Sequence, residues 1–382
     1  MNTVYFDHNS TTALNPAVLD AMLPWLQGQH GNATSRHVFG RLGREAVETA
    51  RKQVATSVGV QASQIVFTSG GTEANNFALK GITANLAASQ VLVSAIEHPC
   101  VSRAAAALAW HDWQISTLEV NAQGVLDMAD ATAQLQAQKT GLISVMLANN
   151  ETGAIQPIAE LAALAKAHKA LVHTDAVQAL GKISLDFTAL GVHAMTISSH
   201  KIGGPIGIGA LVLDKRVDIA PLLHGGGQER GLRSGTENVA GIVGFAKACQ
   251  LAVETVATRS EYLSGLRDQL ETGLRALGVS VFAQQAQRLP NTSFFAVANI
   301  DGETLVIALD KAGYAVASGS ACSSDSTEPS HVLLAMGVEA DLARGAVRVS
   351  LGEHNTAAQI AGFLAALKQE VQRLKGLHAV AA

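Results

Sequence analysis

The sequence predicts an α/β protein in which a large domain is built on a mainly parallel sheet and a smaller domain is α+β. Two observations lead to this prediction. The chain has 382 residues, which at roughly 150 residues per domain indicates two domains. Short apolar stretches alternate with helical patterns between residues 60 and 250, roughly, as in parallel sheets joined by crossover helices. We therefore expect residues 13–255 to form the large domain, and residues 1–12 with 256–382 to form the smaller one.

Strands of the large domain are expected where short apolar stretches end in polar or glycine residues. Such stretches are typical of strands that are buried on both faces. They cover residues 64–68, 91–94, 142–147 and 170–173. A helix is expected after Pro157, because Ile158, Leu161 and Leu164 fall on one helical face.

The smaller domain is predicted from a different pattern. Leucines recur every three or four positions from Leu263 to Leu277, and Gly278 then ends the helix. Strands are expected at residues 292–297 and 346–351. A last helix should begin near Thr356, because apolar residues again recur at helical spacing after it.

Composition excludes several classes of protein. Lysine and arginine total 27 and aspartate and glutamate 31, with no run of like charges, so we expect no nucleic-acid partner and no basic membrane anchor. No apolar stretch approaches the roughly 20 residues that span a bilayer, and the N-terminal residues lack the pattern of a secretory signal. Three cysteines without a C-x-x-C motif predict neither a disulfide framework nor a zinc site. A cytoplasmic protein with reduced thiols and no metal is therefore expected.

The stretch Thr68–Glu73 lies between a predicted strand and a predicted helix. Its small residues allow backbone N–H groups to approach an anion, and the start of a helix favours negative charge. Thr72 adds a hydroxyl donor. We expect an anion site here, although an ordinary glycine turn with a threonine N-cap fits the same residues.

Asp175 and Lys201 are the next candidates. Asp175 is expected where a buried parallel strand ends, at the sheet edge where open α/β proteins bind ligands; the alternative is a helix N-cap. Lys201 follows an apolar stretch and precedes a turn of glycine and proline. It is therefore expected beside a buried surface, where lysine tends toward the neutral amine that Schiff-base chemistry requires. The alternative is a surface lysine in a loop.

Three further segments complete the candidates. Cys322 lies in a run of small polar residues, which suits an exposed and mobile nucleophile, whereas Cys100 and Cys249 are expected to be packing thiols. Asn149–Gly153 offers amide donors at the same sheet edge. The glycine-rich stretch Gly225–Thr236 is long enough to indicate a function, although a long flexible loop is the alternative.

Together these segments supply a phosphate-binding site, an anion that can pair with a ring nitrogen, and a lysine amine. An enzyme that depends on pyridoxal 5'-phosphate (PLP) requires these three groups. The sequence resembles the cysteine desulfurases of the class V aminotransferase group, which implies the PLP-dependent transferase fold type I. The resemblance runs from Tyr5 to Gly352 and so covers nearly the whole chain. It depends on a Ser-x-His-Lys motif ending at Lys201, His-x-Asp-Ala-x-Gln ending at Gln178, Gly-Ser-Ala-Cys ending at Cys322 and Arg-Ser-Gly-Thr ending at Thr236.

The resemblance implies a role for each matching residue. Lys201 would bind the cofactor covalently, Asp175 would pair with its ring nitrogen, and His98 would stack on the ring and move protons. Cys322 would be the nucleophile that accepts sulfur. The matching phosphate ligands are Gly71, Thr72, Ser198 and His200, together with Thr236 from a neighbouring subunit. Asn150 and Gln178 match residues beside the phenolic oxygen of the cofactor. Arg348 and Asn32 match residues at the substrate carboxylate, and Asn150 would also contact the substrate.

The implied reaction converts L-cysteine to L-alanine and leaves the sulfur on Cys322 as a persulfide, for iron–sulfur cluster assembly or thiolation. The resemblance also implies a homodimer with shared active sites and a sulfur-accepting partner, such as an iron–sulfur scaffold or a sulfur carrier. Two alternatives stay open. One is another PLP enzyme of this group: a selenocysteine lyase, a desulfinase or an aminotransferase. The other is a catalytically idle scaffold of sulfur-carrier complexes.

Overall fold

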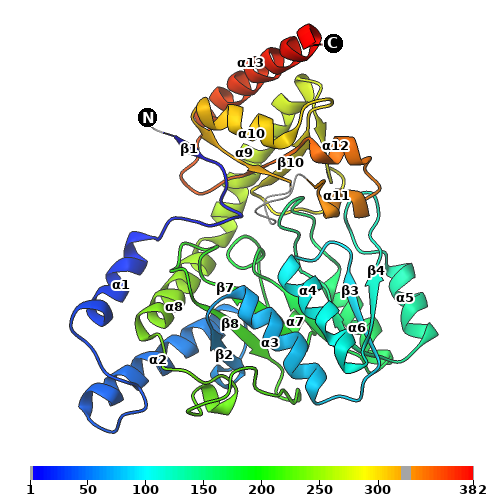
Figure 1. Cartoon of the computed structure of the whole chain (residues 1–382). Helices are drawn as coiled ribbons and strands as arrows, with labels where there is room; N and C mark the ends of the chain where they lie inside the picture. Colours follow the sequence, from blue (N-terminus) through cyan, green and yellow to red (C-terminus); the bar gives the residue numbers. More distant parts are fainter. Residues whose placement is uncertain (1–2, 320–327, 382) are drawn as a thin grey trace.

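The computed structural model describes residues 3–319 and 328–381, which form a central seven-stranded sheet and a smaller four-stranded sheet (Figure 1). The central sheet has the order β2-β8-β7-β6-β5-β3-β4. Its strands are β2 (Ile65–Thr68), β3 (Gln90–Ser94), β4 (Gln114–Leu118), β5 (Thr140–Ser144), β6 (Leu171–Asp175), β7 (Ala194–Ser198) and β8 (Gly209–Leu213). Strand β8 is antiparallel to both of its neighbours, whereas the other neighbouring strands in this sheet are parallel, so the prediction of a mainly parallel sheet is confirmed.

Helices cover both faces of this sheet, because its apolar strand residues point to both sides. One face shares an apolar cluster with α2, α5, α6, α7 and α8, and the other face shares a second cluster with α3 and α4. Helix α1 packs against α8. The helices are α1 (Pro16–Gln27), α2 (Val38–Ser57), α3 (Gly71–Ala84), α4 (Pro99–Ala107), α5 (Met128–Ala137), α6 (Ile158–Ala167), α7 (Phe187–Leu190) and α8 (Val239–Glu254), with short 3-10 turns η1 (Ala62–Gln64), η2 (Leu108–His111) and η3 (Glu229–Gly231).

The smaller sheet is antiparallel, with the order β12-β13-β10-β9. Its strands are β9 (Ser280–Val281), β10 (Thr292–Ala296), β12 (Ala317–Ser318) and β13 (Ala346–Ser350). It packs against α9 (Val256–Ala276), α10 (Gly302–Lys311) and α13 (Ala357–Ala381), and α11 (His331–Ala335) and α12 (Ala340–Arg344) flank it. The predicted leucine-rich helix, the two strands and the last helix are confirmed. Each was marked by an apolar face that the smaller core buries.

The N-terminal segment begins in the smaller part and then reaches the central sheet. Strand β1 (Val4–Tyr5) pairs in parallel with β11 (Tyr314–Ala315), and Phe6 is buried in the smaller core. Further along, the hydroxyl of Thr12 donates to the carbonyl of His200 at 2.8 Å. This path agrees with the assignment of the first residues to the smaller domain, whose exact limits stay a prediction.

Within residues 3–319 and 328–381, no single helix is both long and apolar enough to cross a membrane. Helices α8 and α9 meet those two criteria only when they are joined across a 70° bend.

Candidate active site

A cavity of about 350 Å³ opens where strands of the central sheet end, between the two parts of the chain. Asp175 is the last residue of β6 and Ser198 the last of β7, so the cavity lies at the edge where ligands bind in such sheets. Ten of the residues expected at the site line it: Gly71, Thr72, His98, Asn150, Asp175, Gln178, Ser198, His200, Lys201 and Arg348. The structure thus brings together residues that are widely separated in the sequence.

The carboxylate of Asp175 is fixed by two donors. Asn75, in the first turns of α3, donates to Oδ2 at 2.6 Å, and the backbone N–H of Val177 donates to Oδ1 at 2.9 Å. The side chain of Asp175 therefore has a defined orientation at the cavity. An anion in this place can pair with a protonated ring nitrogen.

The first turn of α3 forms one end of the cavity. Gly71 and Thr72 begin this helix, whose first backbone N–H groups point out of its N-terminus. The hydroxyl of Ser198 is buried beside them and has no hydrogen-bond partner among the residues that the structure describes. His200 also lines this cavity, and burial lowers the pKa of its imidazole to about 4. Helix N–H groups and an unpaired hydroxyl fit a phosphate group.

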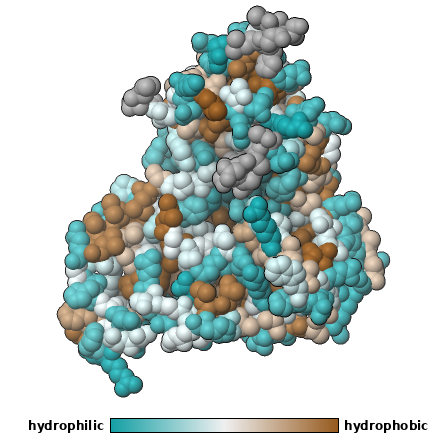
Figure 2. All heavy atoms as spheres, in the orientation of Figure 1, coloured by the Kyte–Doolittle hydropathy of each residue, from teal (hydrophilic) through white to brown (hydrophobic). Residues whose placement is uncertain are grey.

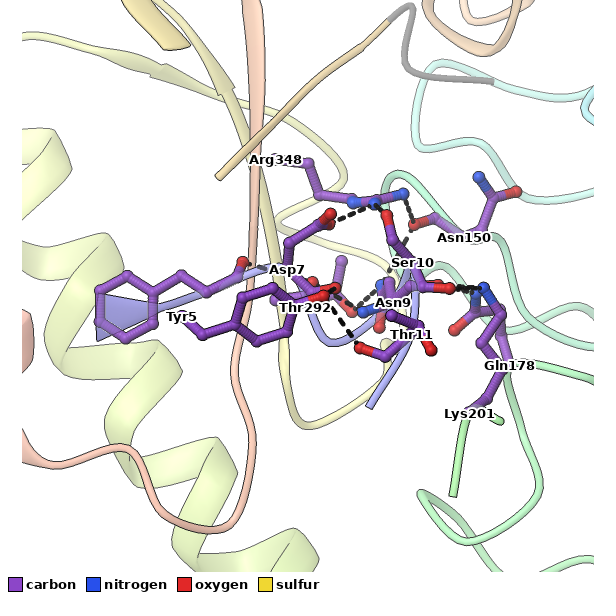
Figure 3. Close-up of polar contacts among 12 residues, drawn as sticks. Tyr5, Asp7, Asn9, Ser10, Thr11, Asn150, Gln178, Lys201, Thr292 and Arg348 are labelled. Atoms are coloured by element: carbon purple, nitrogen blue, oxygen red, sulfur yellow. Dashed lines mark hydrogen bonds and ion pairs between the residues drawn. The ribbon is translucent and has the colours of Figure 1, made fainter. Parts of the chain in front are cut away.

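Lys201 reaches the cavity from the loop after β7. Its amine donates to the carbonyl oxygens of Asn9 and Ser10, each at 2.5 Å, and Figure 3 shows this amine beside Asn9 and Gln178. The N-terminal segment therefore holds the amine at the cavity wall. A lysine in this position can react with an aldehyde on a ligand in the cavity.

His98 is the N-cap of α4, and this fixes its ring. Its Nδ1 accepts a hydrogen bond from the backbone N–H of Cys100 at 3.2 Å and lies 2.9 Å from the Cys100 sulfur. Burial, followed by the fields of Lys201 and His331, lowers the pKa of His98 despite the opposing charge of Asp175. A neutral ring that accepts at Nδ1 carries its proton on Nε2.

Cys249 and Cys100 both pack against apolar clusters, as expected, but Cys100 also has a side toward the cavity that was not predicted. Cys249 is completely buried in the core. Cys100 lines the cavity, because the N-cap at His98 begins the helix at the cavity wall and so places the second helical residue there. Burial first, and then the negative charge of Asp175, raise the pKa of the Cys100 thiol to about 12, so the thiol stays protonated.

The guanidinium of Arg348 is buried and held by three hydrogen bonds. Its Nη1 donates to the carbonyl of Asn150 at 3.0 Å, and its Nη2 donates to Asp7 Oδ1 at 2.7 Å and to Ser10 Oγ at 2.8 Å (Figure 3). These contacts fix the plane of the guanidinium. Asp7 and Ser10 were not predicted, because they come from the N-terminus and no local pattern marks them.

Two predicted residues lie away from this cavity. Asn32 is exposed, and its Oδ1 accepts hydrogen bonds from the backbone and the hydroxyl of Thr34. Thr236 lines a second cavity of about 220 Å³ together with Glu229 and Arg233. Within a single chain, Asn32 and Thr236 therefore do not reach the cavity that holds the other predicted site residues. Cys322 lies outside the described residues.

The stretch Gly225–Thr236 is anchored by charged groups that were not predicted. Glu229 is buried, pairs with Arg51 at 2.6 Å and accepts from the backbone of Phe67 at 2.9 Å. Arg233 forms a bidentate ion pair with Glu73, with N–O distances of 2.7 and 3.0 Å. These pairs tie the stretch to α2, β2 and α3. In the part of the chain that the structure describes, no cluster of His, Cys, Asp or Glu could hold a metal ion.

Comparisons with known proteins agree with this geometry. Residues 4–363 match the family model described as Aminotransferase class-V. The "Cysteine desulfurase IscS" of Dictyoglomus turgidum is 42% identical over 376 residues, which cover 97% of this chain and 95% of that protein. The "Cysteine desulfurase" of Trichormus azollae is 42% identical over 380 residues, covering 99% and 95%.

Solved structures show the same similarity. One titled "NIFS-LIKE PROTEIN" superposes with a TM-score of 0.91 at 37% identity, covering 97% of this chain and 99% of that one. Another, titled "SspA in complex with cysteine", has a TM-score of 0.80 at 30% identity and covers 93% and 100%.

Proposed function

Because the chain belongs to the aminotransferase class-V family, we propose that it is a PLP-dependent cysteine desulfurase, which converts L-cysteine to L-alanine and transfers the sulfur. One observation carries this proposal. The amine of Lys201, the carboxylate of Asp175, the ring of His98 and the guanidinium of Arg348 all reach a single cavity. An aminotransferase needs the first two groups but has no use for a nucleophilic thiol such as Cys322.

The residues of the cavity fit PLP. Gly71, Thr72 and the unpaired hydroxyl of Ser198 would hold the phosphate, and Asp175 would pair with the ring nitrogen. Lys201 would hold the cofactor covalently. When bound, PLP supplies an electron sink that makes the Cα–H bond of an amino acid acidic.

The chain's own groups would bind the substrate and move its proton. Arg348 presents a guanidinium whose orientation is already fixed by Asn150, Asp7 and Ser10, and its charge and remaining N–H groups would bind the substrate carboxylate. Lys201 as a neutral amine, or His98 through Nδ1, the ring nitrogen that carries no proton, would take the proton from Cα. The depressed pKa of His98 keeps its ring neutral near pH 7 and so able to accept a proton.

Cys322 would be the sulfur acceptor. Its thiolate would attack the sulfur of the substrate, so that an S–S bond forms while the C–S bond breaks, and the carbon fragment would leave as alanine. Cys100 does not suit this role, because its thiol stays protonated. The persulfide would then pass to a cytoplasmic acceptor such as an iron–sulfur scaffold or a sulfur carrier.

A homodimer would complete the site. Large apolar side chains are exposed on and beside α1 and α2, where Figure 2 shows a brown area over α1. They are Leu14, Leu19, Leu26, Val38, Phe39 and Leu42. A second copy would cover this surface, and its Thr236 would reach the phosphate. Light scattering of the purified protein tests this proposal, since a monomer at micromolar concentration would contradict it.

The central experiment supplies purified protein with PLP and L-cysteine. We expect equal amounts of alanine and transferred sulfur, and a peptide containing Cys322 that is heavier by one sulfur atom. Cys322→Ala should retain the cofactor spectrum and lose sulfur transfer. Full sulfur release by Cys322→Ala would overturn the assignment of the nucleophile, and a keto acid in place of alanine would indicate transamination.

A further inference from the structure

A second lysine lies behind the cavity. Lys182 is only 7% exposed, does not line the cavity and has no part in the proposed chemistry. Its amine donates to Asn9 Oδ1 at 2.7 Å and to Gln178 Oε1 at 2.5 Å. Lysine is rarely buried to this extent, because burying its charge is costly. Its contacts therefore need an explanation.

Lys182 and the backbone carbonyl of Asn9 together fix which way the amide of Gln178 points. Lys182 and Gln178 are four positions apart in a helical turn, so their side chains lie on one face. As an ammonium group lysine only donates hydrogen bonds, and in this structure the amine of Lys182 donates to Oε1 of Gln178, which therefore faces Lys182. At the other end Nε2 donates to the carbonyl of Asn9, which only accepts, at 2.9 Å. Since Gln178 lines the cavity, the second N–H of Nε2 is left for a ligand.

Lys182 also fixes Asn9, which lies between the two lysines. Oδ1 of Asn9 accepts from Lys182 and from Asn291, while its Nδ2 donates to the carbonyl of Asn150 and to Thr292. The backbone carbonyl of Asn9 accepts from both Gln178 and Lys201. Figure 3 shows Asn9 among Asn150, Gln178 and Thr292. One buried asparagine thus connects the amine of Lys182 to the amine of Lys201.

The turn that carries Lys182 is held from the smaller part of the chain. Ser260 of α9 donates to the carbonyl of Lys182 at 2.6 Å, and Arg259 donates to the carbonyl of Gly181. The charged and titratable groups around Lys182 are the cations Lys201, Arg348 and Arg259, together with His8. Burial, and then the three cations, lower the pKa of Lys182 well below its ordinary value.

We propose that Lys182 is a positioning residue, which orients the amide of Gln178 so that an N–H group, rather than its carbonyl oxygen, faces the bound cofactor. This inference rests on the proposed function, because the N–H group would donate to an anionic oxygen of PLP. Such a donor stabilises the anion and so lowers the proton affinity of the nitrogen that joins Lys201 to the cofactor.

The test is a pH titration of the visible absorbance of the holoenzyme, which does not depend on turnover. Lys182→Met should raise the titration midpoint by about one pH unit, a tenfold increase in proton affinity. Lys182→Leu, which likewise cannot donate to Oε1 of Gln178, should shift it in the same direction and is the variant to use if the methionine lowers cofactor content. Lys166→Met, which removes an exposed lysine from α6, is the control and should titrate like the wild type.

A double-mutant cycle separates positioning from a simple charge effect. In a Gln178→Ala background, Lys182→Met should add less than about a third of its shift in the wild type, because the amide that it orients is gone. A full shift in that background, or no shift in either single variant of Lys182, would overturn the inference. Wild-type protein that binds PLP and titrates but releases no sulfur would contradict the proposed function alone.

Discussion

Arg348 provides the sharpest prediction for substrate binding. The change Arg348→Lys keeps the positive charge but replaces the planar guanidinium and its several N–H donors by a single ammonium group. A carboxylate would lose one charge-assisted hydrogen bond, worth about 1.5–3 kcal/mol, which corresponds to a fall in kcat/KM of about 10- to 150-fold. We expect most of this loss in KM. The cofactor should stay bound, because the change leaves Lys201, Asp175 and the proposed phosphate ligands in place.

Arg288→Lys is the matched control for this prediction. Arg288 is also buried; it forms a bidentate ion pair with Glu271, at 2.7 and 2.9 Å, but does not line the cavity. Its replacement should lower the melting temperature and leave kcat/KM unchanged. Alanine production at a series of cysteine concentrations measures both variants. The reasoning would be refuted if Arg348→Lys stayed within twofold of wild type, or if both variants lost the same factor.

Three further predictions concern protonation and thiol reactivity. Burial raises the pKa of Glu97 from 4.5 to about 8, so between these pH values the folded protein holds a proton that the unfolded chain releases. This residue therefore lowers the free energy of unfolding as pH rises from 4.5 to about 8. Glu97→Gln should therefore gain stability relative to wild type as pH rises over that range, and parallel denaturation curves would contradict this. Burial lowers the pKa of His173 to about 3, so the unfolded chain takes up a proton below pH 6.5, roughly, that the folded protein does not. The free energy of unfolding therefore falls as pH drops from about 6.5, and that of His173→Asn should depend less on pH in this range. Iodoacetamide near neutral pH should label Cys322 before Cys100, whose thiol is protonated, and peptide mass mapping that found Cys100 first would count against the thiol assignments.

Much of the fold could be predicted because its signals are local. The apolar stretch before Asp175 and the leucine spacing in α9 each mark one buried element. The antiparallel direction of β8 could not be read in this way, since it depends on the connection from β7 and not on the composition of the strand.

The site could be predicted in part for the same reason. Asp175 ends a buried strand and Gly71 begins a helix after one, so their sequence context placed them at the sheet edge, whereas Ser198 was implied only by the resemblance. Asn9 and Lys182 could not be found, because the contact between them joins segments 173 positions apart and no periodic pattern encodes such a pair. Cys100 carried a usable signal, since the histidine and proline before it mark a helix start, but its sequence did not show which way the helix faced.

Two lysines approach the same asparagine, and only one of them should carry the cofactor. Borohydride reduction of the holoenzyme, followed by digestion and mass spectrometry, locates the pyridoxyl group on the chain. The account predicts this group on Lys201 alone. A pyridoxyl group on Lys182, or on no lysine after full loading with PLP, would contradict it.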